Sequence, residues 1–205
     1  VPPRAGPELP VPATKSFIAS LSAVPHLVAE WTGDATLREG LAALPDHLAD
    51  AWRQGWSRAL PGLVTGTGHY DVGGGPGSGG AREAALKLKE TCGLHAEAFS
   101  TAEVRHGPMA LVKDGFPVLM LAQSDVTRGD AEALAGDFAA RGARVFLSGR
   151  ADGARMQALP STSGHPALEP VLLIQSFYRL AAQLSVARGY DPDHPPYLNK
   201  VTETV

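Results

Sequence analysis

The sequence of 205 residues contains one cysteine, Cys92, and this scarcity excludes several kinds of protein. A single thiol can neither build a disulfide framework within the chain nor bind zinc through cysteines alone. The sequence also lacks a signal peptide and any apolar run near the ~18 residues of a membrane span. We therefore expect a cytoplasmic protein of a reducing compartment, with no membrane partner.

Neither sign of charge dominates, because 18 lysines and arginines stand against 21 aspartates and glutamates, for a net charge of −3. Nucleic-acid binders that rely on electrostatics need a basic surface, so we expect no nucleic-acid partner. Histidine and glutamate lie close together at His95 and Glu97, but no His-x-x-x-His pair is present to hold a metal ion. We expect no metal and no cofactor.

Glycine and proline are what the sequence has in excess, and eight of the 23 glycines fall within residues 66–80. Gly66-Thr67-Gly68 resembles a phosphate cradle between a strand and a helix. The dinucleotide fingerprint Gly-x-Gly-x-x-Gly, however, would place its third glycine at Asp71, and the Gly-Lys-Ser/Thr of a nucleotide-binding P-loop is absent. The alternative is a strand-to-helix turn extended by a flexible loop.

Hydrophobic periodicity predicts two helices followed by an alternation of strands and helices. Helices are expected over 13–31 and 34–60, with Pro25 kinking the first and Pro45 splitting the second. Further along, strands are expected at 62–66, 116–122, 144–148 and, more weakly, 157–159, and helices at 81–93, 129–141 and 166–189. This alternation predicts an α/β fold over residues 58–190, a parallel sheet between layers of helices, preceded by a helical arm.

Three groups of polar residues are candidates for chemistry. Glu83, Lys87 and Glu90 share one helix face, either as a surface ladder of ion pairs or as a carboxylate held beside a lysine to move protons. His106 precedes Gly-Pro, a pair that interrupts regular secondary structure. Functional groups often lie at such positions, although an isolated histidine is usually structural. Lys200 lies in a proline-rich tail, where a lysine is ordinarily just solvated.

Four segments in this order resemble the sugar isomerase (SIS) family. More narrowly, they resemble the isomerase half of glutamine–fructose-6-phosphate amidotransferase and the SIS-type glucosamine-6-phosphate deaminases. The segments are Ala-Leu-Lys-Leu-Lys-Glu at 85–90, His-Ala-Glu-Ala at 95–98, Glu-Val-Arg-His-Gly-Pro-Met-Ala-Leu at 103–111 and Leu-Asn-Lys-Val-Thr-Glu-Thr-Val at 198–205. The resemblance implies a flavodoxin-like three-layer sandwich.

The resemblance also implies an activity, the interconversion of glucosamine 6-phosphate and fructose 6-phosphate by proton transfer between C1 and C2. Two alternatives stay open, the isomerase domain of a glutamine-dependent synthase and a regulatory SIS domain that binds a sugar phosphate without catalysis. Aldose–ketose exchange needs one base between adjacent carbons, which suits a single carboxylate. Release or transfer of an amine at C2 is helped by an imine with a lysine.

By the same resemblance, Glu90 matches the carboxylate that shuttles the proton, His106 the histidine that opens the sugar ring from across a dimer interface, and Lys200 the lysine that forms a Schiff base. Lys87 would balance charge or contact the substrate. A homodimer is therefore expected.

Three further positions match the substrate-lining residues of the family. Val11 corresponds to a backbone position, Ala13 falls where the synthase usually has serine, and Asn199 departs from the small residue that is common there.

The resemblance divides the chain into residues 1–57, the tail of a preceding SIS domain with a helical linker, residues 58–190, a SIS domain, and residues 191–205, an active-site tail. The sequence has no initiating methionine and no phosphate-gripping Ser-x-Ser-Gly-x-Thr loop. We expect a C-terminal part of a longer chain, inactive alone. About a dozen residues between the first glycines and the 81–93 helix appear as an insertion relative to the family.

Overall fold

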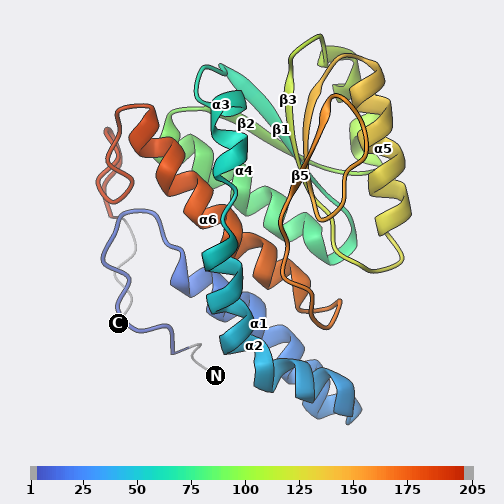
Figure 1. The fold of residues 1–205 in the computed structure, drawn as a ribbon. Helices are drawn as coiled ribbons and strands as arrows, with labels where there is room; N and C mark the ends of the chain where they lie inside the picture. The colour runs from blue at the N-terminus through green and yellow to red at the C-terminus, as the bar shows by residue number, and fades with distance from the viewer. Residues whose placement is uncertain (1–3, 201–205) are drawn as a thin grey trace.

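The computed structural model describes residues 4–200, and a five-stranded sheet lies at its centre (Figure 1). The strand order is β2-β1-β3-β4-β5, and every neighbouring pair is parallel. The strands are β1 (Gly68–Gly73), β2 (His95–Ser100), β3 (Pro117–Leu121), β4 (Arg144–Ser148) and β5 (Met156–Leu159). The predicted α/β class with a central parallel sheet is confirmed.

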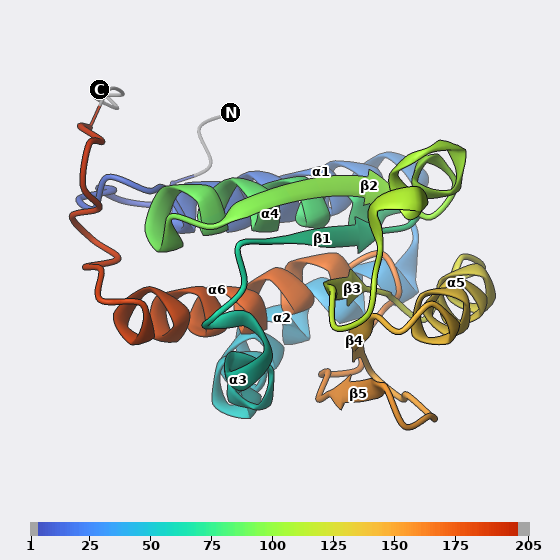
Figure 2. The ribbon, with the colours of Figure 1, turned by 90° about the horizontal axis from the view of Figure 1, so that it is seen from above.

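Helices cover both faces of this sheet (Figure 2). One apolar core joins the sheet to α4 (Ser78–Cys92) and α6 (Glu169–Ala187), and a second joins it to α5 (Arg128–Ala140) on the other face. Strand β3 supplies both cores, because Leu119 faces the first and Val118 the second. Strands buried on both faces are typical of a parallel sheet between helical layers.

The expected helical arm consists of α1 (Lys15–Thr32) and α2 (Ala35–Gln54), which pack against α6. Asp34 caps α2 by accepting hydrogen bonds from the backbone N–H groups of Thr36 and Leu37, 2.9 and 3.1 Å away. The hydroxyl of Ser176 on α6 donates to the carbonyl of Ala51 at 3.0 Å. None of the helices within residues 4–200 is both long enough and apolar enough to cross a membrane.

The predicted split at Pro45 is wrong, because α2 continues through it, as α1 does through Pro25. Leu44 and Leu48, on either side of Pro45, pack in one cluster with Leu168 and Leu172. This shared burial outweighs the one helical hydrogen bond that a proline removes. Helix α2 ends earlier than expected, at Gln54, where Gly55 adopts a φ of +55°.

The strand predicted at residues 62–66 is also wrong, because Leu60–Leu63 is the short helix α3 and the chain enters the sheet only at Gly68. Strand β1 buries His69 and Asp71 completely, with His69 Nε2 2.9 Å from Asp71 Oδ2. Burial raises the pKa of Asp71, and the neighbouring His69 opposes this rise. Because these two buried residues are polar, β1 lacks the apolar run from which a buried strand is predicted.

The flexible loop expected over 66–80 is therefore absent. Strand β1 takes the first half of that segment and α4 begins at Ser78, so that only residues 74–77 connect them. A Cβ on Gly73 would lie 2.5 Å from the carbonyl oxygen of Gly77, which explains why a turn this tight requires glycine. The glycine-rich composition serves close backbone packing.

The remaining elements agree with the prediction within a few residues, with one omission. Strands β3, β4 and β5 and helices α5 and α6 lie where the periodicity indicates. Strand β2, at the edge of the sheet, was not expected, because small and polar residues alternate along His95–Ser100.

Candidate active site

The helix face that carries Glu83, Lys87 and Glu90 is turned into the protein. The Lys87 ammonium lies 2.5 Å from Glu90 Oε2 and 3.5 Å from Glu83 Oε1. The side chains of Lys87 and Glu83 are only 5% and 7% exposed, while that of Glu90 is 25% exposed. The three residues are thus no surface ladder, and Glu90 is the carboxylate that a ligand can reach.

Tyr178 on α6 completes this network from the other side. Its hydroxyl donates to Glu83 Oε1 at 2.7 Å. Burial raises the pKa of Glu83, whereas the hydrogen bond from Tyr178 and the charge of Lys87 act in the opposite direction. Burial and the neighbouring Glu83 raise the pKa of Tyr178 far above its usual range, so the phenol stays protonated as a donor.

A pocket of about 520 Å³ opens beside Glu90 and is walled by three separate segments of the chain. One is the N-terminal segment with the start of α1, the second is α4, and the third is the C-terminal segment. The residues that line it are Val11, Ala13, Ser16, Phe17, Ser20, Glu83, Leu86, Lys87, Glu90, Leu198, Asn199 and Lys200. Six of the seven predicted site residues are in that set.

The two terminal segments are joined to each other at this pocket. The Lys200 ammonium donates to the carbonyl of Pro10 at 2.7 Å, and the backbone N–H of Val11 donates to the carbonyl of Asp193 at 3.2 Å. Figure 1 shows the two segments side by side. Residues 201–205, the end of the predicted tail 191–205, and residues 1–3, the start of the predicted segment 1–57, lie outside the described residues.

Glu8 holds the N-terminal segment against α1. Its carboxylate accepts a hydrogen bond from the backbone N–H of Ser16 at 2.8 Å, which places a negative charge at the start of the helix. Burial acts to raise the pKa of Glu8, but the hydrogen bonds from Ser16, Thr14 and Lys15 together lower it. Glu8 thereby fixes the chain that carries Val11 and Ala13.

His106 is not brought together with the other predicted residues. It ends the 3-10 helix η3 (Glu103–His106), is exposed, and is not part of the pocket lining. The following Gly107 has a φ of +139°, so regular secondary structure is interrupted at this point as predicted. Within this chain, His106 faces solvent.

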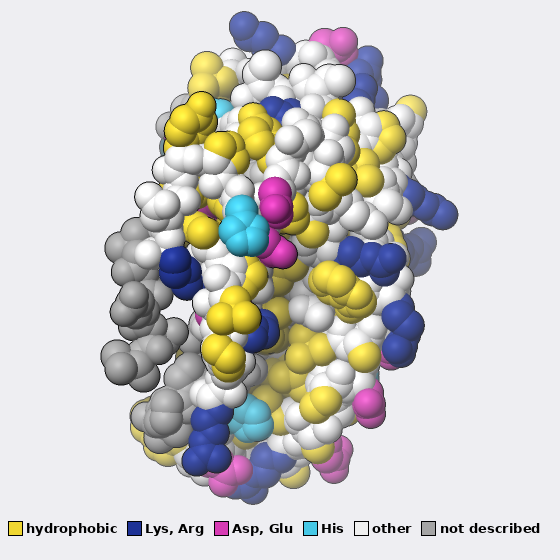
Figure 3. Space-filling view, turned by 90° about the vertical axis from the view of Figure 1, so that its left-hand side faces the viewer, with side chains coloured by type: hydrophobic (Ala, Val, Ile, Leu, Met, Phe, Trp, Pro, Cys, Tyr) yellow, Lys and Arg dark blue, Asp and Glu magenta, His cyan; other side chains and the backbone are white. Residues whose placement is uncertain are grey.

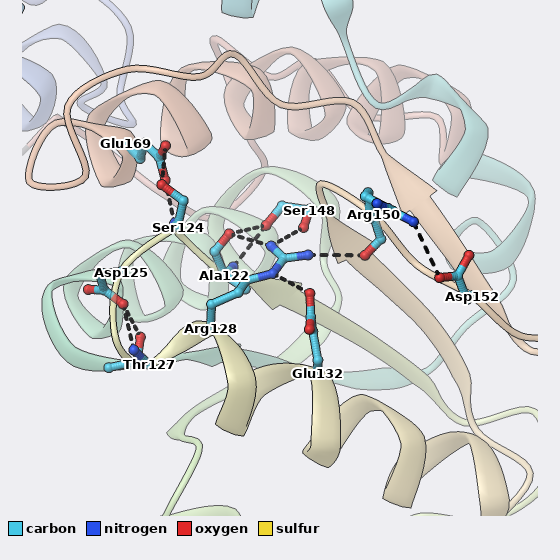
Figure 4. A network of polar contacts seen from close by, with 10 residues as sticks. All are labelled: Ala122, Ser124, Asp125, Thr127, Arg128, Glu132, Ser148, Arg150, Asp152 and Glu169. Atoms are coloured by element: carbon cyan, nitrogen blue, oxygen red, sulfur yellow. Dashed lines mark hydrogen bonds and ion pairs between the residues drawn. The ribbon is translucent and has the colours of Figure 1, made fainter.

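The carboxyl edge of β3 and β4 is occupied by the protein's own contacts (Figure 4). Ligands of α/β proteins commonly bind at such an edge. Here the Arg128 guanidinium donates to the carbonyls of Ala122, Ser148 and Arg150 at 2.7–3.1 Å, and its Nε pairs with Glu132. Through these contacts the Arg128 guanidinium connects the chain that follows β3 to the chain that follows β4.

No group of three or more His, Cys, Asp or Glu side chains within residues 4–200 is arranged to hold a metal ion. Sequence reasoning did not find Tyr178, Ser16 and Ser20 as parts of the site. Tyr178 is 95 residues from its partner Glu83, so nothing local in the sequence marks it. The two serines follow Ala13 on successive turns of α1, and their spacing is the only signal that could have found them.

The chain has a parallel sheet between helical layers, and its residues 71–148, from β1 to the end of β4, match the model of the SIS domain family. The chain is 38% identical to a glutamine–fructose-6-phosphate aminotransferase (isomerizing) from Aeropyrum pernix, over 96% of this chain and 35% of that protein. It thus spans about a third of the length of the curated relatives it matches.

Two solved structures share the fold. A candidate phosphosugar isomerase from Silicibacter pomeroyi superposes with a TM-score of 0.87 at 42% identity, covering 93% of this chain and 58% of that one. A glucosamine-6-phosphate deaminase from Thermotoga maritima superposes with a TM-score of 0.72 at 26% identity, covering 95% of this chain and 58% of that one.

Proposed function

We propose that this chain is the catalytic part of an enzyme that interconverts glucosamine 6-phosphate and fructose 6-phosphate. The observation that carries the proposal is the Glu90 carboxylate, which is partly exposed in the pocket and paired with a buried Lys87. The names of the relatives from Aeropyrum pernix and Thermotoga maritima support this substrate class.

Glu90 takes a proton from one of the two adjacent carbons, C1 or C2, of the open-chain sugar and returns it to the other. One carboxylate serves both steps because it lies between the two carbons. The Lys87 ammonium, 2.5 Å away, orients this carboxylate, and Glu83 with Tyr178 orients Lys87 in turn. Val11, Ala13 and Asn199 line the volume in which the sugar lies.

Lys200 serves the amine chemistry. Its amino group adds to the C2 carbonyl of the ketose with loss of water, and the imine that results makes exchange of nitrogen at C2 easier. The observation that supports this role is the position of Lys200 in the lining of the same pocket as Glu90, although the two are 110 residues apart in sequence.

The proposed enzyme is a cytoplasmic homodimer, in which His106 of one copy serves the sugar ring bound to the other. His106 is exposed and separate from the pocket of its own chain, which agrees with such a role. Helix α1 also presents an apolar stripe to solvent, with Val24, Leu27 and Trp31 exposed by 60%, 66% and 84%. Contiguous exposed apolar surface is typical of interaction sites.

A second candidate function is the isomerase domain of a glutamine-dependent synthase, which the name of the Aeropyrum pernix relative favours. Both functions use the same proton transfer, so they share the roles given to Glu90 and Lys200. A regulatory domain that only binds a sugar phosphate is disfavoured, because binding alone requires no carboxylate–lysine pair buried beside the ligand.

The experiment is the substitution Glu90→Gln in the complete protein. Loss of a positioned general base costs about 10²- to 10⁴-fold, so we expect turnover of glucosamine 6-phosphate to fructose 6-phosphate to fall by that factor. Binding of fructose 6-phosphate, measured by calorimetry, should change only a few-fold. The matched control is Glu97→Gln, an exposed glutamate on β2. Turnover of the Glu90 variant equal to that of the control would remove Glu90 from the mechanism.

A further inference from the structure

A second pocket adjoins the candidate active site. It has a volume of about 430 Å³ and is lined by the N-terminal segment, α1, α2, α4, α6 and the C-terminal segment. Lys87 is the one residue that lines both pockets. The volume falls within the range of about 300–1,000 Å³ typical of small-molecule sites.

A thin partition formed by residues 10–14 separates the two pockets. Val11 and Ala13 line the pocket of Glu90, whereas Pro10, Pro12 and Thr14 line the pocket behind. The partition is held at two points by the hydrogen bonds from Val11 N–H to Asp193 and from Lys200 to Pro10. The backbone of residues 10–14 therefore forms part of the wall of both pockets.

The lining of the second pocket is mostly apolar and offers a flat surface. Ile18, Trp52 and Ala182 provide apolar contact, and the three prolines of the two terminal segments add rigid edges. The side chain of Trp52 remains 45% exposed, and the Arg179 guanidinium lies over its ring, 5.9 Å from the centroid, so one face of the ring is left for stacking. Polar contact comes from Gln175 and Thr14.

The cations of this pocket already have partners. Lys87 is paired with Glu90 and Glu83, and the Lys15 ammonium donates to the carbonyl of Pro7 at 2.7 Å. The carboxylate of Asp193 belongs to an exposed residue at the rim. The pocket therefore presents no unpaired cation to an anion and no buried carboxylate to a cation.

From this lining we infer that the second pocket is a binding site for a small, uncharged ring compound with one polar edge. Its ring stacks on Trp52 and its polar edge meets Gln175 and Thr14. Occupation of the site shifts the partition at Val11 and Ala13, and so couples the second pocket to the pocket of Glu90. The inference concerns ligand binding alone, so it can be tested whether or not the proposed reaction is correct.

The test is an NMR titration of the 15N-labelled chain with indole and, separately, with benzamide. Both probes carry an apolar ring, an N–H donor and no charge. We expect the side-chain N–H signal of Trp52 to shift to saturation, while that of Trp31, 84% exposed near the other end of α1, stays in place. The backbone signals of Val11 and Ala13 should shift with the same saturation curve.

Two variants control for nonspecific binding. Ala182→Phe fills the half-buried lining of the pocket and should weaken binding at least tenfold, whereas Ala187→Phe, exposed on the same helix, should leave it unchanged. If Ala182→Phe does not fold, Trp52→Leu removes the stacking surface and should weaken binding similarly, followed through the Gln175 side-chain signal.

Benzoate tests the charge of the ligand, since it differs from benzamide in carrying a negative charge, and it should bind several-fold more weakly. Tighter binding of benzoate contradicts an uncharged ligand. Equal affinity of the Ala182 and Ala187 variants, or a linear drift of all three tryptophan signals, contradicts the site itself. A shift of Trp52 without any shift of Val11 and Ala13 contradicts the coupling.

Discussion

At the scale of single residues, the most consequential side chain is Lys87, a cation that the fold takes almost completely out of water. Its charge is compensated by Glu90 and Glu83, and Tyr178 supplies a further donor to Glu83. A buried ion pair is not a large net source of stability, but removal of one partner leaves the other charge uncompensated.

Lys87→Met should therefore destabilise the protein strongly, by about 3 kcal/mol, because it leaves the buried Glu83 without its cation. The measurement is the free energy of unfolding from urea titration. Lys89→Met, two residues away and exposed, is the control and should stay within about 0.5 kcal/mol of the wild type. Equal stabilities of the two variants would show that the charge of Lys87 does not contribute to the stability of the fold.

At the scale of elements, the first turn of helix α1 is capped by the carboxylate of Glu8, which accepts a hydrogen bond from the Ser16 N–H. The residue at the N-cap position itself, Thr14, makes no side-chain capping hydrogen bond. Glu8→Gln should cost about 1 kcal/mol at pH 7, as the loss of a helix cap usually does. The folded-state pKa of Glu8 is lowered, so its contribution is present above the ordinary value of 4.5 and is lost as the pH falls through the lower folded value.

The measurement for Glu8 is unfolding by urea at a series of pH values between 7 and 2. The difference between wild type and Glu8→Gln should be full at neutral pH and should vanish at the acid end. A difference that is independent of pH would show that the carboxylate charge has no part in holding α1.

The turn between β1 and α4 depends on the absence of a side chain at Gly73. A Cβ there would lie 2.5 Å from the carbonyl oxygen of Gly77, so Gly73→Ala should cost about 1–3 kcal/mol through overpacking. At Gly79, inside the first turn of α4, a Cβ meets nothing within 4 Å. Gly79→Ala should instead stabilise by about 0.5–1 kcal/mol.

Thermal unfolding of the two alanine variants measures this contrast directly. The melting temperature should fall for Gly73→Ala and rise for Gly79→Ala. A rise for both would contradict the tight turn and return the segment to a flexible loop.

At the scale of the whole molecule, exposed apolar side chains on helix α1 offer a surface that a second copy of the chain could cover. Figure 3 shows another feature of the surface, a face on which apolar and charged side chains are mixed. If the proposed homodimer uses the stripe on α1, a charge at its centre should separate the copies, because burying an unpaired carboxylate is costly.

Leu27→Glu should therefore yield a monomer at concentrations where the wild type sediments as a dimer. Analytical ultracentrifugation measures the mass. Val126→Glu, which charges a residue 98% exposed outside α1, should remain a dimer. If both variants remain dimers, α1 is not part of the interface. A monomeric wild type would contradict the homodimer.

Much of the fold was predictable because it follows from local periodicity. The apolar runs of β3 and β4 and the helical pattern of α5 and α6 are visible in any short window of the sequence. Strand β1 was not predictable in this way. Two of its five buried residues, His69 and Asp71, are polar, and they lie against each other inside the core.

By itself, the sequence determined the α/β class and the shared face of Glu83, Lys87 and Glu90, because strand–helix alternation and helical spacing are local properties. Only the tertiary structure decided that this face is buried, that Tyr178 binds Glu83 and that Lys200 meets Pro10. These contacts join residues 95 and 190 positions apart, and such pairings arise only when packing of the whole chain brings the segments together.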